Sequence, residues 1–109
     1  MKLGPMYKIL QLGDVLVDGQ ALAAVCERYG VSELSIFGSA ARGEMHPDSD
    51  VDMMVEFAAG VRVGLLRFES LAEELQSLTG RSVDLVTRRG LKAWVRPSVL
   101  EDARVIYAA

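Results

Sequence analysis

The sequence is short of the residues that build disulfide, zinc and membrane proteins. Cys26 is the single cysteine among 109 residues, so the chain forms no internal disulfide and suits a reducing compartment. His46 is the single histidine and lies far from Cys26 in the sequence, which argues against zinc ligation. No apolar run approaches the roughly 20 residues that span a bilayer, and the N-terminal residues make a poor signal peptide. We therefore expect a soluble, cytoplasmic protein without membrane contact.

The sequence also lacks an excess of positive charge. Twelve Lys and Arg residues against fifteen Asp and Glu residues give a formal net charge of −3. Proteins that coat nucleic acid depend on neutralising many phosphates, so this balance argues against direct nucleic-acid binding, although a local basic patch is compatible with it. Half of the residues are hydrophobic and a quarter are charged, as in ordinary globular domains. The length allows one domain with one core, and we assign residues 1–109 to it.

Hydrophobic periodicity predicts alternating helices and strands. Asp18 is a good N-cap for the first helix, and Gly30 is a good residue to end it. The strand over 50–57 has period two, which places Asp50, Asp52, Met54 and Glu56 on one face. Residues 1–17 resist assignment, with 15–17 either a short strand or a packed loop, so the core is 18–107. The full set is helices over 18–29, 64–78 and 98–103, and strands over 34–37, 50–57, 82–87 and 105–107. This order predicts an α/β or α+β domain with a small mixed sheet flanked by helices.

Gly38 and Ser39 stand where the strand over 34–37 gives way to a helical turn. A glycine has no Cβ, so its backbone can approach a phosphate closely and make the tight turn. The N-terminus of the following helix adds free N–H groups and partial positive charge, and Ser39 adds a hydroxyl donor. Read in isolation, this pair is more typical of a simple turn with an N-cap.

Two carboxylates alter that interpretation. Asp50 and Asp52 lie ten or more residues after the Gly-Ser pair, at the start of an apolar strand, and point to the same side of it. Two like charges so close are unfavourable without a cation or solvent between them. Mg²⁺ commonly takes one or two carboxylates together with substrate phosphates. A solvated acidic loop would look similar, but Asp52 lies inside the apolar strand, where a carboxylate is unusual.

Asp84 is a third acid, flanked by Val83 and Leu85. If its strand pairs beside the strand of Asp50 and Asp52, the three carboxylates could form one metal site. Such a site suits phosphoryl-type transfer by two metal ions about 3.5–4 Å apart. For Asp84 alone, a structural role is as good an interpretation as a functional one.

Together these residues resemble the nucleotidyltransferase superfamily that includes DNA polymerase beta. The segments that carry the resemblance are 37–43, FGSAARG, and 47–52, PDSDVD, with a later Asp on a strand. Their form is similar to that of the minimal nucleotidyltransferases, the antitoxins of HEPN/MNT toxin–antitoxin pairs. The resemblance covers about residues 20–87, and the segment 97–107 also fits the family's tail. It implies a core like the polymerase beta palm.

The resemblance implies a role for each matching residue. Gly38 and Ser39 would hold the triphosphate of ATP, with Arg42 as a further phosphate contact. Asp50 and Asp52 would bind Mg²⁺, with two ions expected, and Asp84 would complete the metal site and help to activate the acceptor. The activity implied is transfer of AMP from ATP to a tyrosine of a HEPN RNase toxin, which neutralises the toxin.

Two other functions remain as alternatives. The chain could be a non-catalytic antitoxin that neutralises its toxin by covering it, or a nucleotidyltransferase that modifies a small molecule. A chain of 109 residues leaves little protein to hold an acceptor, so we expect a partner or a second copy to supply that part. The sequence leaves open whether the chain forms a homo-oligomer or a hetero-oligomer with the toxin. Trp94 and the basic cluster Arg88, Arg89, Lys92 and Arg96 could contact a partner; Trp94 fits the core slightly better.

Overall fold

A mixed four-stranded sheet forms the centre of the molecule in the computed structural model, which describes residues 9–109. The strand order is β5-β4-β3-β6, so β3, the first of these four strands in the sequence, is not at the edge. Strand β4 pairs in parallel with β5 and antiparallel with β3, and β6 pairs antiparallel with β3. The fold class predicted from the sequence is therefore confirmed. The bounds are β3 (Val31–Phe37), β4 (Val51–Phe57), β5 (Val83–Thr87) and β6 (Arg104–Ala108).

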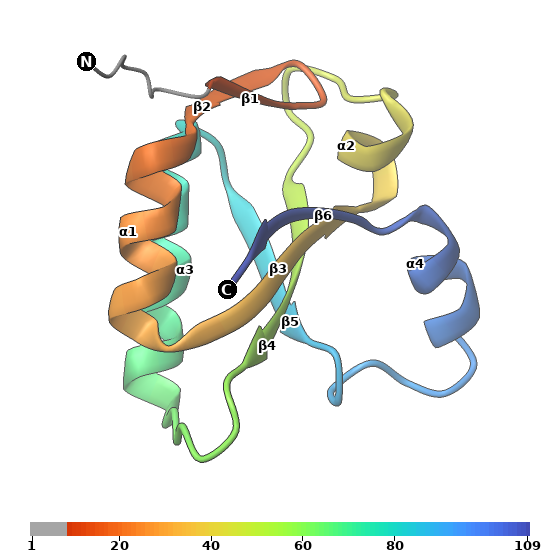
Figure 1. The fold of residues 1–109 in the computed structure, drawn as a ribbon. Coiled ribbons are helices and arrows are strands. Elements are labelled where there is room, and N and C mark those ends of the chain that lie inside the picture. Colours follow the sequence, from red (N-terminus) through yellow and green to blue (C-terminus); the bar gives the residue numbers. More distant parts are fainter. Residues whose placement is uncertain (1–8) are drawn as a thin grey trace.

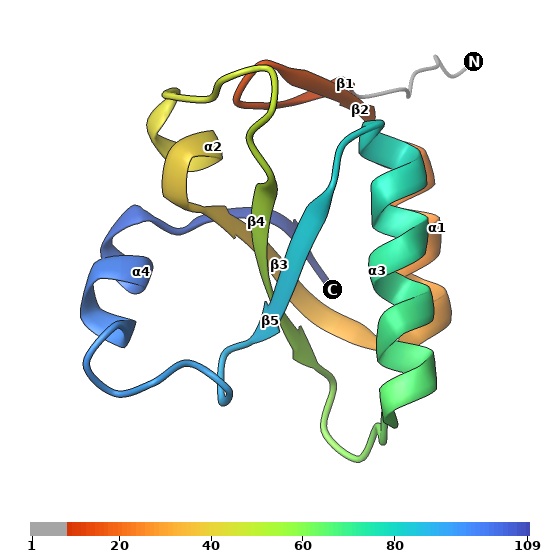
Figure 2. The same ribbon diagram turned by 180° about the vertical axis from the view of Figure 1, so that it is seen from behind.

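Helices lie on both sides of this sheet (Figure 1). The two longer helices, α1 (Gly19–Tyr29) and α3 (Leu65–Thr79), pack side by side on one face. The shorter helices, α2 (Gly38–Arg42) and α4 (Arg96–Asp102), lie on the opposite side, as the view from behind also shows (Figure 2). Within residues 9–109, no helix combines the length and the apolar character that crossing a membrane requires.

The core lies between the sheet and the two longer helices. Val51, Met53 and Val55 of β4 are fully buried on this face, where they meet Leu71 and Leu75 of α3. Burying each such side chain contributes about 1.5–3 kcal/mol, so these contacts fix which face of β4 points inward. Asp52 and Glu56 consequently lie on the other face, as the period of two predicts.

Helix α1 begins and ends where the sequence predicts. The carboxylate of Asp18 accepts hydrogen bonds from the backbone N–H groups of Gln20, at 2.9 Å, and Ala21. Gly30 ends the helix in the left-handed conformation, with φ of 71°. Cys26 is completely buried on the inner stripe of α1, where burial raises the pKa of its thiol to about 12. The thiol is therefore neutral at physiological pH and acts as a packing group.

Some elements differ from the prediction. The segment left open at 15–17 is a strand, β2 (Val15–Asp18), and it forms a hairpin with β1 (Ile9–Leu12), which the sequence did not reveal. Strand β3 starts at Val31 rather than residue 34, because a bulge between Val31 and Glu33 disturbs the alternation of apolar residues. The last helix starts at Arg96, earlier than predicted, and residues 91–95 contain only turns.

The prediction that Trp94 fits the core is wrong. Its side chain is 79% exposed in the turn before α4. A single tryptophan in a turn has no periodic pattern around it, so the sequence offered little to decide its burial. Residues 1–8, part of the segment that resisted assignment, lie outside the described residues.

An ion pair joins the two long helices. Arg28 near the end of α1 donates two hydrogen bonds to the carboxylate of Glu74 on α3, at 3.0 and 2.6 Å. The hydroxyl of Tyr29 donates a third, at 2.6 Å, and the guanidinium of Arg67 lies 4.4 Å from the centre of the Tyr29 ring. The hydrogen bonds from Arg28 and then Tyr29 lower the pKa of Glu74 from 4.5 to about 2. The contact therefore holds α3 against α1 while Glu74 is ionised.

Replacing Glu74 tests this contact through its pH dependence. The folded-state pKa lies below the unfolded value, so the stabilisation is present above about pH 4.5 and is lost between about pH 4.5 and 2. Glu74→Gln should lower the melting temperature at pH 7 by a few degrees, with the difference shrinking as the pH falls through that window. Thermal unfolding followed by circular dichroism measures it, with Glu73→Gln on the exposed side of α3 as control. Equal melting temperatures of wild type and Glu74→Gln at pH 7 would contradict the account.

Candidate active site

The register of the sheet brings the residues singled out in the sequence to one place. Phe37, the residue before Gly38, pairs with Asp52 across β3 and β4. Asp52 in turn pairs with Asp84 across the parallel strands β4 and β5. Asp52 therefore stands between the Gly-Ser turn on one side and Asp84 on the other. From the sequence, Asp84 could be placed near Asp52 only if their two strands were neighbours. The structure shows that they are.

Gly38 makes the turn from β3 into α2 and touches Asp52. Its φ of 68° lies in the left-handed region, which strains any residue with a Cβ. A Cβ built at this position would also collide with Oδ2 of Asp52. The glycine is thus required twice, once for the conformation of the turn and once for the close approach of the carboxylate. The two halves of the sequence motif are in direct contact.

Asp52 is half-buried and carries a charge that its surroundings disfavour. Burial raises the pKa of its carboxyl, and the negative charges of Asp84 and Asp50 raise it further. Arg42 acts in the opposite direction and lowers that pKa, but it does not reverse the shift. An ionised Asp52 at this position would be stabilised by a cation between the carboxylates.

The carboxylates fit a magnesium ion by their chemistry, although they do not enclose one by themselves. Asp50 and Asp84 are exposed, and within residues 9–109 no three side chains of the His, Cys, Asp and Glu types form a group that could hold a metal ion. Mg²⁺ needs only one or two protein carboxylates when phosphate oxygens and waters complete its shell. Asp52 and Asp84, hard oxygen donors on adjacent strands with an unfavourable mutual charge, meet that requirement.

Ser39 and Arg42 lie on the short helix α2, next to Asp52. The first N–H groups of a helix have no partner within the helix, so this turn offers donors beside the carboxylates. Arg42 is engaged in two ion pairs, with Glu44 at 2.9 Å and with Asp102 of α4 at 2.7 Å. These ion pairs use Nε and Nη1 of Arg42, so a phosphate contact could be made through Nη2 without breaking either of them. Neither ion-pair partner was singled out in the sequence: Glu44 follows the motif segment 37–43 directly, but Asp102 is 60 residues from Arg42.

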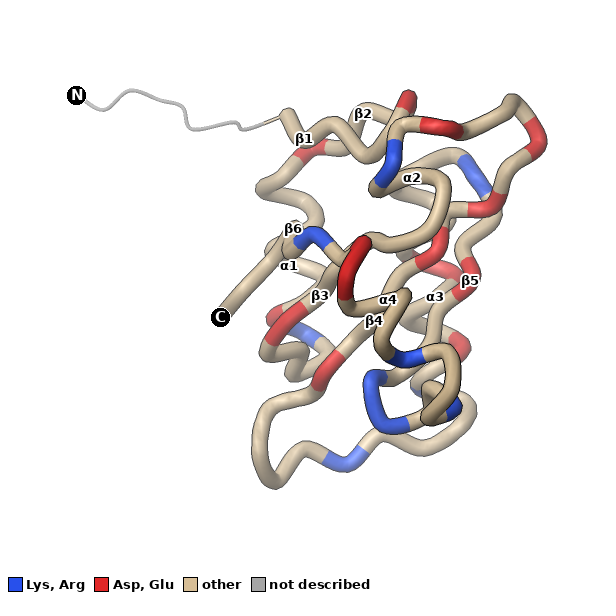
Figure 3. Tube along the Cα trace, turned by 90° about the vertical axis from the view of Figure 1, so that its right-hand side faces the viewer, with Lys and Arg blue, Asp and Glu red and all other residues tan. Residues whose placement is uncertain are grey.

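A hollow of about 770 Å³ lies at the opposite end of β4 and β5. Its lining includes Glu56, Arg88, Arg89 and Arg96, and Arg88 pairs with Glu56 at 2.9 Å. Asp52 and Glu56 lie four positions apart along β4, a distance of about 13 Å. Figure 3 shows basic positions gathered in the chain that leads into α4, whereas acidic and basic positions are mixed near α2. This hollow and the carboxylate site are therefore different places.

Substitution of Gly38 tests its contact with Asp52. Gly43→Ala provides a matched control, because Gly43 also has a positive φ, 73°, but open space where the Cβ would stand. The control should cost about 1–2 kcal/mol of unfolding free energy through backbone strain. Gly38→Ala should cost about 1–3 kcal/mol more through the steric conflict. Denaturant unfolding measures both; equal costs for the two variants would exclude a contact with Asp52.

The ionised carboxylate of Asp52 should lower the stability of the folded protein. Its folded-state pKa is raised, so the ionised carboxylate opposes folding at neutral pH, and this penalty disappears below the unfolded pKa of 3.8. Asp52→Asn should therefore melt at a higher temperature than wild type at pH 7 in buffer with EDTA. The gain should vanish near pH 3. The exposed residue Asp48 provides the control variant, Asp48→Asn, and a lower melting temperature of Asp52→Asn at pH 7 would contradict the charge repulsion described above.

Comparison with known proteins gives one consistent family. The model of the nucleotidyltransferase domain family matches residues 19–107. The chain is 44% identical over 81 residues to protein adenylyltransferase MntA of Thermococcus cleftensis, covering 74% of this chain and 78% of that protein. It is 40% identical to a minimal nucleotidyltransferase of known structure, with a TM-score of 0.67 and coverage of 79% and 86%.

Two toxin–antitoxin structures share the fold at lower identity. One, solved with AMP-PNP, has a TM-score of 0.68 at 22% identity and covers 84% of this chain and 73% of that one. The other holds a tri-AMPylated HEPN toxin of Shewanella oneidensis with its MNT antitoxin, and has a TM-score of 0.60 at 18% identity over 84% and 70% of the chains. With its matching family model, its sequence identity to MntA and its site geometry, the chain belongs to the nucleotidyltransferase domain family and is similar to the minimal members of that family.

Proposed function

We propose that this protein is a magnesium-dependent protein adenylyltransferase and acts as an antitoxin. It transfers AMP from ATP to a tyrosine of a cognate HEPN toxin and so neutralises the toxin. The observation that carries the proposal is the pairing of Asp52 with Asp84 directly beside the Gly38 turn. The relative named a protein adenylyltransferase, at 44% identity, supports the choice of acceptor class. The toxin–antitoxin structures that share the fold support ATP as the donor and a toxin as the partner.

One group of site residues binds the triphosphate of ATP, and a second group binds the metal that neutralises its charge. The Gly38 backbone and Ser39 hydroxyl bind the triphosphate, and Arg42 adds a phosphate contact through Nη2. Asp50, Asp52 and Asp84 would hold Mg²⁺, with two ions expected. When bound, the metal neutralises phosphate charge and lowers the pKa of the acceptor hydroxyl. Most of the rate enhancement then comes from positioning and from preorganised charges.

The transfer step balances as a displacement at phosphorus. The tyrosine oxygen of the partner forms a bond to the α-phosphorus, while the bond from that phosphorus to the bridging oxygen of the β-phosphate breaks. Pyrophosphate leaves with the electron pair, and Asp84, exposed at the edge of the pair, accepts the proton of the hydroxyl. Because Asp84 is the more open of the two paired acids, the acceptor approaches from its side.

Loss of any one paired carboxylate should abolish most of the transfer. Asp52→Asn and Asp84→Asn each remove a ligand whose metal supplies several kcal/mol of charge stabilisation, so the rate of AMP transfer should fall about 100-fold or more. The assay uses labelled ATP, Mg²⁺ and the partner toxin, with added AMP detected by intact mass. Asp48→Asn, an exposed acid of the preceding loop, should transfer AMP at the wild-type rate.

A double variant of the first two aspartates separates the alternatives. An Asp50→Ala/Asp52→Ala variant that transfers AMP as fast as wild type would contradict the proposed chemistry. If that variant silenced the toxin without any modification, the chain would be a binding antitoxin. AMP transfer to a small molecule without any protein partner would identify the third alternative. The cytoplasmic location expected from the single cysteine stays a prediction.

A further inference from the structure

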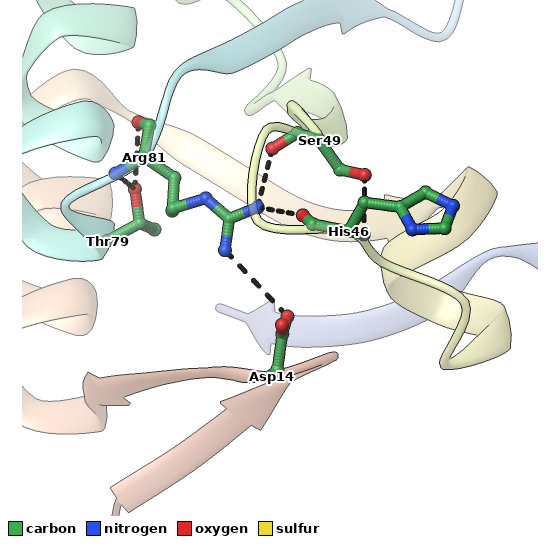
Figure 4. Close-up of polar contacts among 5 residues, drawn as sticks. All are labelled: Asp14, His46, Ser49, Thr79 and Arg81. Carbon is green, nitrogen blue, oxygen red and sulfur yellow. Dashed lines mark hydrogen bonds and ion pairs between the residues drawn. The ribbon is translucent and has the colours of Figure 1, made fainter.

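Arg81 is a largely buried arginine outside the sequence motif. It lies where the loop before β4 meets the start of β5. Its side chain is only 18% exposed. One terminal nitrogen, Nη2, donates to two backbone carbonyls of the loop, those of His46 and Ser49, both at 2.8 Å. The other, Nη1, faces the carboxylate of Asp14 in the β1–β2 turn at 3.8 Å. Figure 4 shows the guanidinium between these partners.

The backbone of Arg81 is fixed as firmly as its side chain. The hydroxyl of Thr79, at the end of α3, accepts a hydrogen bond from the Arg81 N–H and contacts the Arg81 carbonyl, both at 3.2 Å. Arg81 is therefore anchored to the end of α3 before its side chain reaches the loop. A long side chain held at its base loses less entropy when its end makes hydrogen bonds, so this arrangement suits a rigid tether.

The loop that Arg81 holds has little other structure. Residues 43–50 contain no helix or strand, and His46, Pro47 and Asp48 are exposed. Within the loop, the Ser49 N–H donates to the His46 carbonyl at 2.9 Å and the Ser49 hydroxyl accepts from the His46 N–H at 2.8 Å. These bonds close a local turn, but they do not connect it to the sheet. The Arg81 guanidinium makes that connection.

The positions of the partners relate this tether to the candidate active site. Asp50 directly follows Ser49, and Asp84 lies three residues after Arg81. The first backbone hydrogen bond between the two segments runs from the Val51 N–H to the Ser82 carbonyl at 2.8 Å, so Asp50 lies between this bond and the tether at Ser49. Fixing the Ser49 carbonyl to Arg81 therefore fixes where Asp50 stands relative to Asp84.

We propose that Arg81 is a positioning residue that holds the loop of Asp50 in register with Asp84, so that the carboxylates can share a metal ion. This inference rests on the proposed function, because only a metal-binding site requires Asp50 and Asp84 to be held in a fixed relation. A lysine could supply the charge but not the fork that reaches two carbonyls and Asp14 together. The proposed role therefore depends on the shape of the guanidinium group as well as on its positive charge.

The first test needs neither metal nor nucleotide. Arg81→Met keeps the aliphatic stem and removes the guanidinium, so exchange of the hydrogen-bonded amides of His46 and Ser49 should become about ten-fold faster or more, while exchange within α3 stays unchanged. Arg62→Met, in the exposed segment before α3, is the matched control and should behave as wild type. Unchanged exchange in the loop of Arg81→Met would overturn the tether.

The second test separates positioning from general stability. Calorimetric titration with AMP-PNP is run once with Mg²⁺ and once with EDTA. For Arg81→Met, the affinity should fall about 10-fold with Mg²⁺, in the range found for groups that orient metal ligands, and should change little in EDTA. Arg81→Lys should lie between this variant and wild type, and it replaces Arg81→Met if that variant does not fold.

The outcomes distinguish a failure of the role proposed for Arg81 from a failure of the proposed function. An equal loss of affinity in Mg²⁺ and EDTA would make Arg81 a purely structural residue and overturn the proposal. Wild-type affinity of both Arg81 variants would do the same, while leaving the proposed function intact. If the wild type itself bound AMP-PNP no better with Mg²⁺ than with EDTA, the proposed function would fail first, and with it the purpose assigned to Arg81.

Discussion

The double pairing of β4 is the constraint on which the site depends. Val51, Met53 and Val55 are buried against the long helices, so β4 has one permitted face and a slip of one residue would turn its core outward. With the register fixed, Asp52 must face away from the core, next to Phe37 on one side and Asp84 on the other. Packing of apolar residues on one face thereby determines the placement of the carboxylates on the other.

The site also places opposing demands on the fold. Burial and two neighbouring acids raise the pKa of Asp52, so the charge that we propose to bind a cation is one that the folded protein alone disfavours. The surrounding structure tolerates it because the core, the helix pair joined at Glu74 and the caps of α1 supply stability elsewhere. An arrangement that is unfavourable without a ligand and relieved by one is typical of a functional site.

The sequence predicted the fold better than it predicted the contacts that complete the site. The helix over 18–29 and the strand over 50–57 were found because caps and strict periodicity are local properties of the chain. The pairing of Asp84 with Asp52 stayed conditional, since which strands become neighbours depends on the whole sheet. Arg81 left no sequence signal at all, because its partners are two backbone carbonyls 32 and 35 residues away, and any sequence has carbonyls there. The exposed position of Trp94 was missed because a tryptophan in a turn has no periodic pattern around it.

One structure of this protein with Mn²⁺ and AMP-PNP tests the central claim most directly. Mn²⁺ is a close substitute for Mg²⁺ and can be located by its anomalous scattering. The account predicts a Mn²⁺ ion bound to the carboxylates of Asp52 and Asp84 at about 2.0–2.2 Å, with the phosphates of the analogue on the Gly38 and Ser39 turn. Phosphates bound instead in the basic hollow lined by Arg88, Arg89 and Arg96, with no metal on Asp52, would contradict it.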